Sequence, residues 1–541
     1  MEEDIAFLYS KNIRLTKRAF EYLAKNKIER SILESLVQKS KLLLDLEDIK
    51  EVVEEKSVEK KIKFPPLKNI QPISLSKGEE VYSHEKKNEE AQLKSPTYFE
   101  SSVKEEEVSP AIGLDVKEVE IVRADKFKPI AKEYSPRIKI VEQECQTINS
   151  LGTVETFVSY FRDRLEQQRS ILSNRQSNLP IVRLDQLSKY SGQDVRIIGM
   201  VYDKRLTSKG NLLVELEDEY GQARVVVPSS ENCFREAQGI IRDDIIAIDG
   251  RVLENMFIAK NILWPDISVL KSFPQCQEDL AIVYLSDLHF GSRYFLEKPF
   301  KRFLRWLEGK EGNEQLASKV KYIIIAGDLV DGIGVYPSQE DDLLIKDIFE
   351  QYREFEKAIE QIPDYISVII GPGNHDAVRR AEPQPKIDKS LLDNKNDSFI
   401  LINSPAIVKI EELTHLIYHG TSLDSLISNI PGMSYAKPEL AMKEILKRRH
   451  LSPIYGDNLI VPSSKDFMLI KLEPDVLHMG HIHKNAAEKY RGVLMINSGT
   501  YQDRTDYQIK MGHVPTPAIT PVLEIKSAQL SHLKFLEQDF L

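Results

Sequence analysis

Short apolar runs alternate with longer amphipathic segments throughout the C-terminal half of the chain. Apolar residues recur at helical spacing over 300–307 and 342–361. A short continuous apolar run predicts a strand that is buried on both faces, whereas spacings of three and four residues predict an amphipathic helix. The alternation therefore predicts a layered α/β domain over residues 275–541. Its expected strands lie at residues 281–285, 322–326, 366–370, 416–418, 476–479 and 493–496.

The pattern is different between residues 151 and 274. The spacing of Phe157, Phe161 and Leu165 predicts a helix over 154–172 with one buried face. Short β-like segments follow, and two of them flank Asp218-Glu219-Tyr220-Gly221, which is typical of a hairpin turn. A brief helical stretch at 234–237 comes after the third segment. The expected strands lie at 195–202, 212–217, 223–227, 245–252 and 257–262, an arrangement that matches an OB-type β-barrel.

The N-terminal part of the chain divides into two segments of different composition. Residues 1–55 contain stretches of helical spacing that Thr16 and Ser31 would cap, which predicts a small helical module. Residues 56–150 are rich in charge and proline, which predicts a flexible charged linker. Two β-like patches in it, at 119–122 and 138–141, are expected to order on a partner. The chain is thus predicted to be a multidomain α/β protein with a helical module, a linker, a barrel and a layered domain.

Composition and charge restrict how such a protein could hold a polyanion. Of the 541 residues, 41% are hydrophobic and 29% are charged, and the formal net charge is −10. A nucleic acid would therefore need a local basic surface, bound metal ions or a basic partner. No apolar stretch approaches the ~20 residues of a membrane span, and no signal-peptide pattern is present. With three widely spaced cysteines that are expected to stay reduced (Cys145, Cys233 and Cys276), these features predict an intracellular, cytoplasmic protein without a membrane partner.

Five short polar blocks follow or interrupt the apolar runs of the α/β region. Carboxylate and amide oxygens and imidazole nitrogens are the donors that hold Mg²⁺, Mn²⁺, Fe or Zn²⁺. Because each block lies at an expected strand end, where loops build active sites, we expect these side chains to meet. The blocks are Ser286-Asp287-Leu288-His289, Gly327-Asp328-Leu329-Val330-Asp331, Gly373-Asn374-His375-Asp376, His419-Gly420 and Gly480-His481-Ile482-His483.

The spacing within the blocks predicts how the donors are used. In Asp287-x-His289 and His481-x-His483, the two side chains are expected to point the same way from an extended segment. The two oxygens of Asp328 could bridge two metal ions, and Asn374 offers a neutral amide oxygen. Together the blocks could hold two divalent ions about 4 Å apart, which is what a two-metal phosphoesterase requires. The predicted ligands are Asp287, His289, Asp328, Asn374, His419, His481 and His483.

His375 is left over from this ligand set and is free for proton transfer. With Asp376 beside it, it is the candidate for protonating the departing oxygen, so His375 and Asp376 are the predicted catalytic residues. The remaining histidines match no ligand block and are expected to be structural. They are His415, His450, His478, His513 and His532.

The ordered blocks resemble the calcineurin-like metallophosphoesterases, including their double-strand-break-repair nuclease branch. A barrel ahead of a C-terminal phosphoesterase domain, with a helical unit and tether before it, is similar to the B-subunit family of replicative DNA polymerases. The run Asn497-Ser498-Gly499-Thr500-Tyr501-Gln502 also looks like the C-terminal portion of that family. The resemblance covers residues 150–541. It points to the archaeal, family D branch, because this chain has kept every metal ligand, as that branch has.

This resemblance implies an activity, a division of ligands and a set of partners. The implied activity is a proofreading 3′-to-5′ exonuclease supported by two Mn²⁺ or Mg²⁺ ions, with Fe or Zn as alternatives that the imidazoles would tolerate. The implied partners are the large catalytic subunit of the polymerase, in a heterodimer or larger assembly, the 3′ end of a DNA primer and, through the complex, the sliding clamp. One metal would take Asp287, His289 and His483, and the other Asn374, His419 and His481, with Asp328 shared and His375 as proton donor.

Other functions stay open on the sequence. An independent break-repair-type nuclease would cut duplex ends without a polymerase partner. A non-catalytic scaffold subunit would need no converging metal-binding blocks, and a phosphoesterase for small molecules or phosphoproteins would need no barrel. DNA contact by the barrel is also open, because Lys204, Arg205 and Lys209 near Tyr202 suit a strand-binding groove and a solvated loop equally.

Overall fold

The computed structural model describes most of the chain beyond residue 126. The described residues are 14–15, 43–44, 116–118, 127–142, 150, 152–254, 256–392, 399–510 and 512–536. The predicted helical module therefore lies outside the described residues, apart from β1 (Arg14–Leu15) and β2 (Leu43–Leu44), which pair in parallel. Most of the predicted linker, and Cys145 within it, lie outside them as well.

The C-terminal domain is built on two β-sheets. The first has seven strands in the order β13-β12-β11-β10-β19-β20-β3, and the second has six in the order β17-β18-β16-β15-β14-β4. In the first sheet the strands are β10 (Ala281–Leu285), β11 (Val320–Ala326), β12 (Ser367–Gly371), β13 (Phe399–Leu401), β19 (Ile519–Glu524), β20 (Gln529–Lys534) and β3 (Val116–Glu118). In the second they are β4 (Ile138–Glu142), β14 (Ala406–Ile410), β15 (Leu413–Ile417), β16 (Val476–Met479), β17 (Asn485–Tyr490) and β18 (Val493–Ser498).

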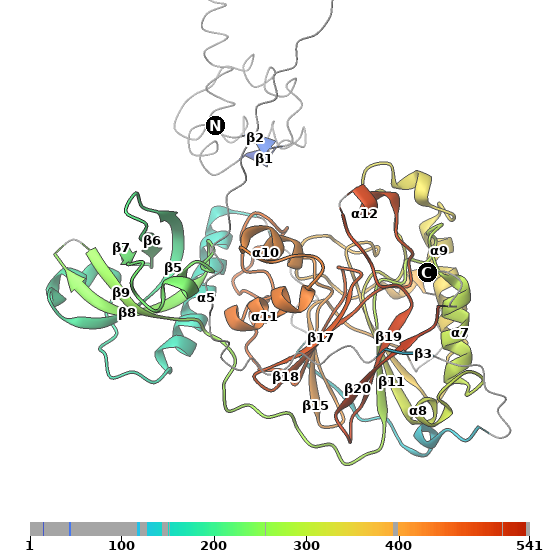
Figure 1. Ribbon diagram of the computed structural model, residues 1–541. Helices are drawn as coiled ribbons and strands as arrows, with labels where there is room; N and C mark the ends of the chain where they lie inside the picture. The colour runs from blue at the N-terminus through green and yellow to red at the C-terminus, as the bar shows by residue number, and fades with distance from the viewer. Residues whose placement is uncertain are drawn as a thin grey trace, which may run out of the picture. The chain divides into compact units, whose positions relative to one another are not determined.

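Helices cover the outer faces of both sheets. Figure 1 shows α10 (Leu423–Asn429) and α11 (Pro438–Arg448) on one side, and α7 (Glu297–Leu307), α8 (Glu314–Lys319) and α9 (Ile348–Ile359) on the other. Along β10, alternate residues face different cores. Val283 packs with the helices of the outer layer, and Ile282 and Tyr284 pack against the second sheet. Burial on both faces explains the unbroken apolar runs, and the predicted layered α/β domain is confirmed.

The parallel strands place the polar blocks together at the carboxyl ends of the strands in each sheet. Strands β10, β11, β12 and β13 are parallel neighbours in the first sheet, and β15, β16 and β18 are parallel in the second. The blocks begin one or two residues after β10, β11, β12, β15 and β16, so every block lies at the carboxyl end of a buried strand.

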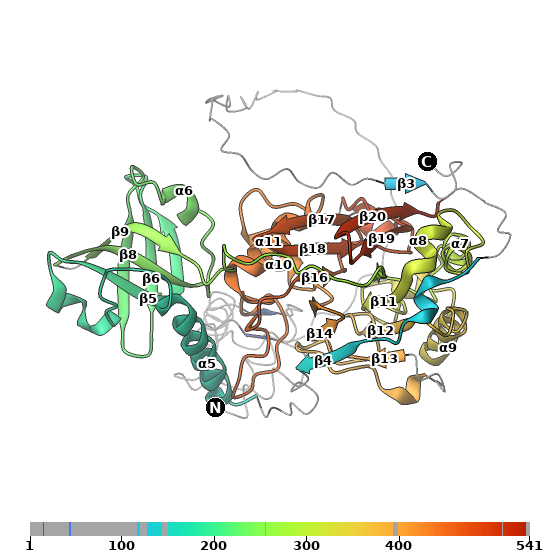
Figure 2. The same cartoon turned by 90° about the horizontal axis from the view of Figure 1, so that it is seen from below.

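Part of the predicted linker belongs to this domain. Strand β3 pairs with β20, and β4 pairs with β14 at the edge of the second sheet, where Ile138 and Ile140 pack against the core (Figure 2). Arg137 forms ion pairs with Glu411, Glu412 and Glu278. The linker prediction over 56–150 is therefore wrong at residues 116–118 and 138–142, which join sheets of their own chain. A short apolar patch in a charged segment does not reveal which sheet edge it will join.

The second structural unit of this region is a closed barrel of five strands. Its strands are β5 (Asp194–Leu206), β6 (Leu212–Glu217), β7 (Gln222–Val227), β8 (Ile245–Leu253) and β9 (Met256–Leu263), in the order β5-β6-β7-β9-β8. Helix α6 (Phe234–Ala237) follows the third strand, as predicted. The Asp218 side chain accepts hydrogen bonds from the backbone N–H groups of Tyr220 and Gly221, which forms the predicted turn between β6 and β7.

Helix α5 (Val154–Ser173) lies against both the barrel and the α/β domain. Leu165 and Leu172 pack on the barrel, and the buried Arg164 pairs with Asp466 of the α/β domain at 2.6 Å. A second buried pair, Arg448 with Asp244 at 2.7 Å, joins the same two parts. The predicted helix is confirmed, but its buried face includes an arginine that hydrophobic spacing could not indicate.

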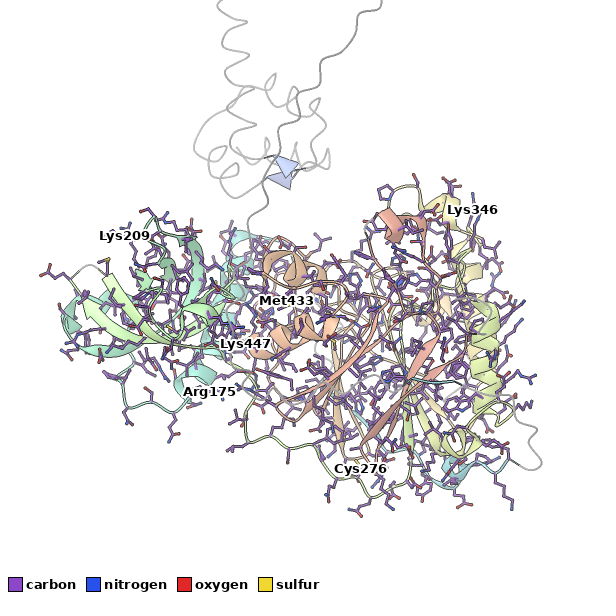
Figure 3. All side chains as sticks on the ribbon, in the orientation of Figure 1. Arg175, Lys209, Cys276, Lys346, Met433 and Lys447 are labelled. Carbon is purple, nitrogen blue, oxygen red and sulfur yellow. The ribbon has the colours of Figure 1, made fainter. Side chains whose placement is uncertain are left out.

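Further contacts at this junction involve long basic side chains. Lys447 lies 3.8 Å from the centre of the Trp264 ring, and Arg175 bonds to the carbonyls of Pro265 and Asp266 (Figure 3). Among the described residues, Cys233 and Cys276 are free and buried. None of the helices in the described part of the chain has the length and apolar character of a membrane span.

Candidate metal centre

The structure brings the predicted donors together where the loops leave the strands. Asp287, Asp328, His289, His419 and His483 are buried, while Asn374, His375 and His481 are half-buried. Two neighbouring groups of donors result, and one carboxylate lies between them.

Several of these residues have an unusual backbone conformation. The φ angles of Asp287, His289, Asp328, His481 and His483 lie between 52° and 68°, in the left-handed region. Each such residue costs about 1–3 kcal/mol, and strain of this kind concentrates at functional sites. The prediction that the Asp287 and His481 pairs project from extended segments is therefore wrong. The chain turns sharply at each donor, so that His481 and His483 face different groups.

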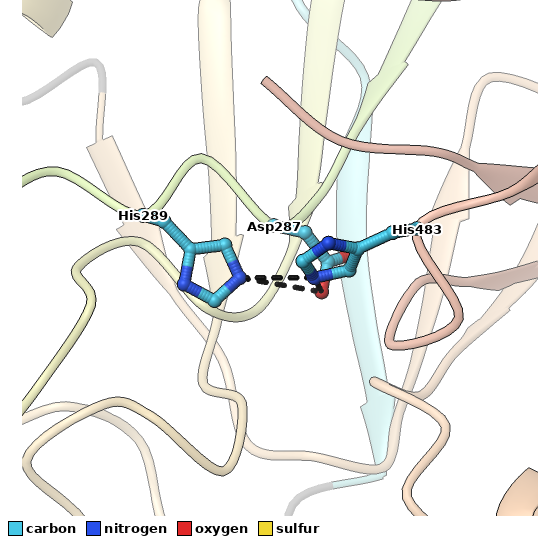
Figure 4. A group of neighbouring side chains, drawn as sticks. All are labelled: Asp287, His289 and His483. Atoms are coloured by element: carbon cyan, nitrogen blue, oxygen red, sulfur yellow. Dashed lines mark hydrogen bonds and ion pairs between the residues drawn. The ribbon is translucent and has the colours of Figure 1, made fainter. Parts of the chain in front are cut away.

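The first group consists of Asp287, His289 and His483 (Figure 4). The Nε2 atoms of the two imidazoles are 3.0 Å apart, and Nε2 of His483 lies 3.3 Å from Oδ1 of Asp287. Nδ1 of His289 is 3.0 Å from Oδ1 of Asp331. Burial opposes ionisation of Asp331, but the hydrogen bond from His289 lowers its pKa, so that the carboxylate accepts the Nδ1 proton. The lone pair on Nε2 of His289 is thereby directed at the centre of the group.

The second group consists of Asn374, His419 and His481. Oδ1 of Asn374 lies 3.0 Å from Nε2 of His419 and 3.1 Å from Nδ1 of His481. Nδ1 of His419 donates to the carbonyl of Ala326 at 2.8 Å, so its Nε2 carries the lone pair in the neutral ring. That lone pair faces Oδ1 of Asn374 and Oδ2 of Asp328. Such an arrangement is repulsive unless a cation or a proton lies between the nitrogen and the oxygens.

The carboxylate of Asp328 lies between the two groups. Its Oδ2 is 3.3 Å from Nε2 of His419 and 3.8 Å from Nε2 of His289. Burial lowers the pKa of His419, but the neighbouring Asp328 outweighs burial and raises the pKa to about 10. Without metal, a proton thus neutralises the clustered oxygens. The same donor set of carboxylate, amide and imidazole fits divalent cations, which would replace that proton.

His375 lies beside both groups with a defined orientation. Its Nδ1 donates to the carbonyl of Asp331 at 2.7 Å, and its Nε2 faces Oδ2 of Asp328 at 3.9 Å. Its backbone N–H donates to Oδ1 of Asp328 at 2.9 Å. Burial lowers the pKa of His375 to about 4, so the ring is neutral near pH 7 in the free protein.

Asp376, predicted to assist His375, faces away from it. Its carboxylate accepts hydrogen bonds from the backbone N–H groups of Gly373 and Leu329 and from the hydroxyl of Tyr352. Burial raises its pKa to about 7. These bonds tie the loop after β11 to the loop after β12, which supports a positioning role for Asp376, and its predicted part in proton transfer stays a prediction.

Comparisons with known proteins agree with this geometry. The calcineurin-like phosphoesterase family matches residues 280–485. The DNA polymerase II small subunit of Methanocaldococcus jannaschii is 41% identical over 426 residues, which cover 76% of this chain and 71% of that protein. The small subunit of Pyrococcus horikoshii is 34% identical over 530 residues, 90% of this chain and 85% of that protein. The small subunit of Archaeoglobus fulgidus is 41% identical over 385 residues, 70% of this chain and 77% of that protein.

The chain belongs to the DNA polymerase II small subunit family. The two resemblances predicted from the sequence, to calcineurin-like phosphoesterases and to polymerase B subunits, are thus confirmed. The phosphoesterase fold implies that the domain binds divalent metal, and the donors described above are its candidate ligands.

The structure of this family member adds residues that the sequence did not single out. Asp424 in α10 contacts Nε2 of His481 at 2.9 Å, and Gln508 contacts Nδ1 of His483 at 2.8 Å. Asp331 fixes His289 and also accepts a hydrogen bond from Gln502. Only Asp331 lay within a recognised block. The others come from segments whose position depends on the fold.

Three of the histidines expected to be structural have buried partners away from the donors. His415 bonds to the hydroxyl of Tyr284, His450 to Asp466, and His478 to the hydroxyl of Ser498. Burial lowers the pKa of His415 to about 4, so this ring stays neutral inside the sheet sandwich.

Glycines let the loops of this phosphoesterase site approach closely. A Cβ at Gly373 would lie 2.5 Å from the backbone N of Asp328 and 2.8 Å from Cε1 of His419, closer than non-bonded atoms come. Gly373→Ala is therefore expected to displace Asp328 and to reduce hydrolysis about 10²-fold, the effect of a misplacement near 1 Å. Metal content by mass spectrometry and phosphodiester hydrolysis would measure the change.

The last residue of β12, just before this loop, supplies a control for the substitution. A Cβ at Gly371 would first meet Cγ1 of Ile402 at 3.6 Å, an ordinary contact. Gly371→Ala should therefore leave metal content and hydrolysis close to those of the wild type. Equal effects of the two substitutions would contradict the close-approach argument.

Proposed function

We propose that this chain is the small subunit of a heteromeric replicative DNA polymerase and removes nucleotides from the 3′ end of DNA. The position of Asp328 carries the proposal, because a carboxylate shared by two donor groups is what a two-metal phosphodiesterase needs. The large catalytic subunit is the expected partner, since the relatives are named as small subunits of a polymerase.

The proposed ligands divide as the resemblance implies. Asp287, His289 and His483 would hold one divalent ion, Asn374, His419 and His481 the other, and Asp328 would bridge. Mn²⁺ or Mg²⁺ suits the oxygens, and Fe or Zn would suit the imidazoles. Bound there, the ions would polarise the phosphoryl oxygens and lower the pKa of a coordinated water.

His375 is the proposed proton donor. The bond from Nδ1 to the Asp331 carbonyl leaves Nε2 directed at the site, where a departing oxygen would lie. An incoming phosphodiester is negatively charged and would raise the low pKa of His375, so that Nε2 takes up a proton. As water bonds to phosphorus and releases one proton to solvent, the bond to the 3′ oxygen of the shortened strand breaks and the His375 proton passes to that oxygen. The ring then returns to its neutral form.

The barrel is proposed to be an OB fold, but its predicted basic cluster is small. The closed order β5-β6-β7-β9-β8, with β7 parallel to β9 and a helix after the third strand, supports the OB assignment. Lys204 donates to the carbonyls of Gln238 and Ile240, and Arg205 pairs with Glu215. Lys209 lies near the end of the barrel (Figure 3). A chain with net charge −10 therefore depends mainly on metals or on its partner to hold DNA.

The expected activity can be tested with a 5′-labelled single-stranded oligonucleotide. With Mn²⁺, the full chain should produce a ladder of progressively shorter labelled products, and EDTA should abolish it. Immediate release of a labelled mononucleotide would instead indicate the opposite polarity, which this proposal takes from the family resemblance. The large subunit, added to a parallel reaction, should change the amount of product but not the pattern.

The same assay separates the alternatives. Efficient cleavage of blunt duplex ends without the large subunit would favour an independent break-repair-type nuclease. Binding to the large subunit without hydrolysis, under any of the four metals, would favour a scaffold. Neither alternative is supported by a particular contact in the described residues.

A further inference from the structure

Two stacked tyrosines lie next to the proposed proton donor. The ring centres of Tyr336 and Tyr507 are 5.4 Å apart, and the planes differ by 27°. Tyr336 in turn lies 6.3 Å from the ring centre of His375, which packs edge-on against His289 at 4.7 Å. A row of rings thus leads from the donor groups to the protein surface, where Tyr507 is 45% exposed.

Both tyrosines are held in position by neighbours of the site. The hydroxyl of Tyr336 donates to Asp342 at 3.0 Å. Tyr507 belongs to α12 (Asp506–Lys510), and the next residue, Gln508, bonds to the donor His483. Thr505 accepts the backbone N–H of Gln508, which fixes the start of this short helix. The exposed ring is therefore fixed relative to the donors, so little conformational freedom would be lost on binding.

The chemistry of this position suits a nucleobase. The rings have no part in holding metal, and an exposed aromatic face beside a phosphodiester site is a surface on which a base can stack. Stacking of this kind does not depend on the identity of the base, because every base has a π face. A base still paired and stacked in a duplex has no free face to offer.

We propose that Tyr507, backed by Tyr336, stacks on the unpaired terminal base of the DNA strand whose last phosphodiester lies at the donor groups. This inference rests on the proposed exonuclease function and names its substrate as a single-stranded or frayed 3′ end. Tyr507 is thereby a substrate-binding residue, which selects strands by the freedom of the last base and not by its sequence.

The test compares two oligonucleotides that differ only at the 3′ end. One carries a normal terminal nucleotide, and the other ends in an abasic deoxyribose with the same phosphodiester. Tyr507→Ala should raise KM for the normal end about tenfold or more while kcat stays nearly unchanged, the expected loss of one base stack. The abasic end should give the same KM with the wild type and with Tyr507→Ala.

Further variants separate stacking from other losses. Tyr507→Phe keeps the ring and should behave as the wild type, whereas Tyr507→Leu keeps apolar volume without a π face and should behave as Tyr507→Ala. Leu270→Ala is a control for loss of an exposed side chain, because Leu270 is 89% exposed in the segment between the barrel and the α/β domain. This variant should change the KM of neither substrate.

Three results would overturn the inference. One is a KM for the normal end that Tyr507→Ala does not change. Another is an equal increase for normal and abasic ends, which would indicate a structural role. The third is unchanged hydrolysis with weaker binding of the large subunit, which would make this surface a protein contact. If the wild type hydrolyses neither oligonucleotide with Mn²⁺, the proposed function itself fails, which is a distinguishable outcome.

Discussion

Asp328→Asn is expected to remove bound divalent metal from both donor groups and to abolish hydrolysis. The carboxylate lies within 3.9 Å of ring nitrogens of His289, His375 and His419, so its negative charge serves the whole centre. An amide of the same size offers one oxygen and no charge. In one orientation the NH₂ group of the asparagine would point at the position between the two donor groups, where it cannot bind a cation. In the other orientation it would face the backbone N–H of His375, which donates to the carboxylate in the wild type. The substitution therefore changes the chemistry and keeps the volume.

The measurements are metal content after dialysis and thermal unfolding with and without Mn²⁺. The wild type should hold two ions and gain stability from added metal, by about 2.7 kcal/mol for each ion at a hundredfold excess over Kd. Asp328→Asn should hold fewer than one ion and gain little. Asp424→Asn is the matched control, because Asp424 contacts the outer nitrogen of His481, is hydrogen-bonded to Tyr435 and is half exposed. It should weaken metal binding about 10- to 100-fold without emptying the site. Two ions retained by Asp328→Asn would contradict the bridging role.

The candidate ligands could be predicted because of how the domain is built. Strands buried on both faces appear in the sequence as unbroken apolar runs, and the next residues necessarily lie at the strand ends. The strands preceding Asp287, Asp328 and Asn374 are parallel neighbours in one sheet, so their ends meet. Five such ends, each followed by a metal-binding residue type, were sufficient to place the candidate site.

The supporting residues were not predictable for an equally physical reason. Asp424 and Gln508 reach the site from helices whose packing depends on the whole fold. The left-handed turns at the donors were also missed, since a local pattern of alternate residues favours an extended strand. Sequence adjacency to His375 also did not indicate that the Asp376 carboxylate accepts hydrogen bonds from the backbone of two loops. The edge strand β4 was predicted to be part of the linker, because the residues around it in the sequence are mostly charged and give no sign of the sheet that it joins.

His375→Ala is expected to keep the fold and the bound metals but to lose most of the catalysis. The ring donates one hydrogen bond, to the carbonyl of Asp331, and the hydrogen bonds that orient the candidate ligands His289 and His419 go to Asp331 and Ala326 instead. Removal of a positioned proton donor typically lowers kcat about 10²- to 10⁴-fold. Metal content and the midpoint of thermal unfolding should stay near the wild-type values, while kcat on a single-stranded oligonucleotide falls within that range.

Asp376→Ala should show the opposite pattern and thereby separate chemistry from positioning. It leaves two backbone N–H groups and the hydroxyl of Tyr352 without their acceptor, and a buried unsatisfied donor costs about 1–3 kcal/mol. The unfolding free energy should therefore fall, and metal binding should weaken as the loops after β11 and β12 separate. If His375→Ala instead retained the wild-type kcat, the departing oxygen would have to take its proton from water. The orientation of His375 toward Asp328 would then serve only to hold the loop that carries Asn374.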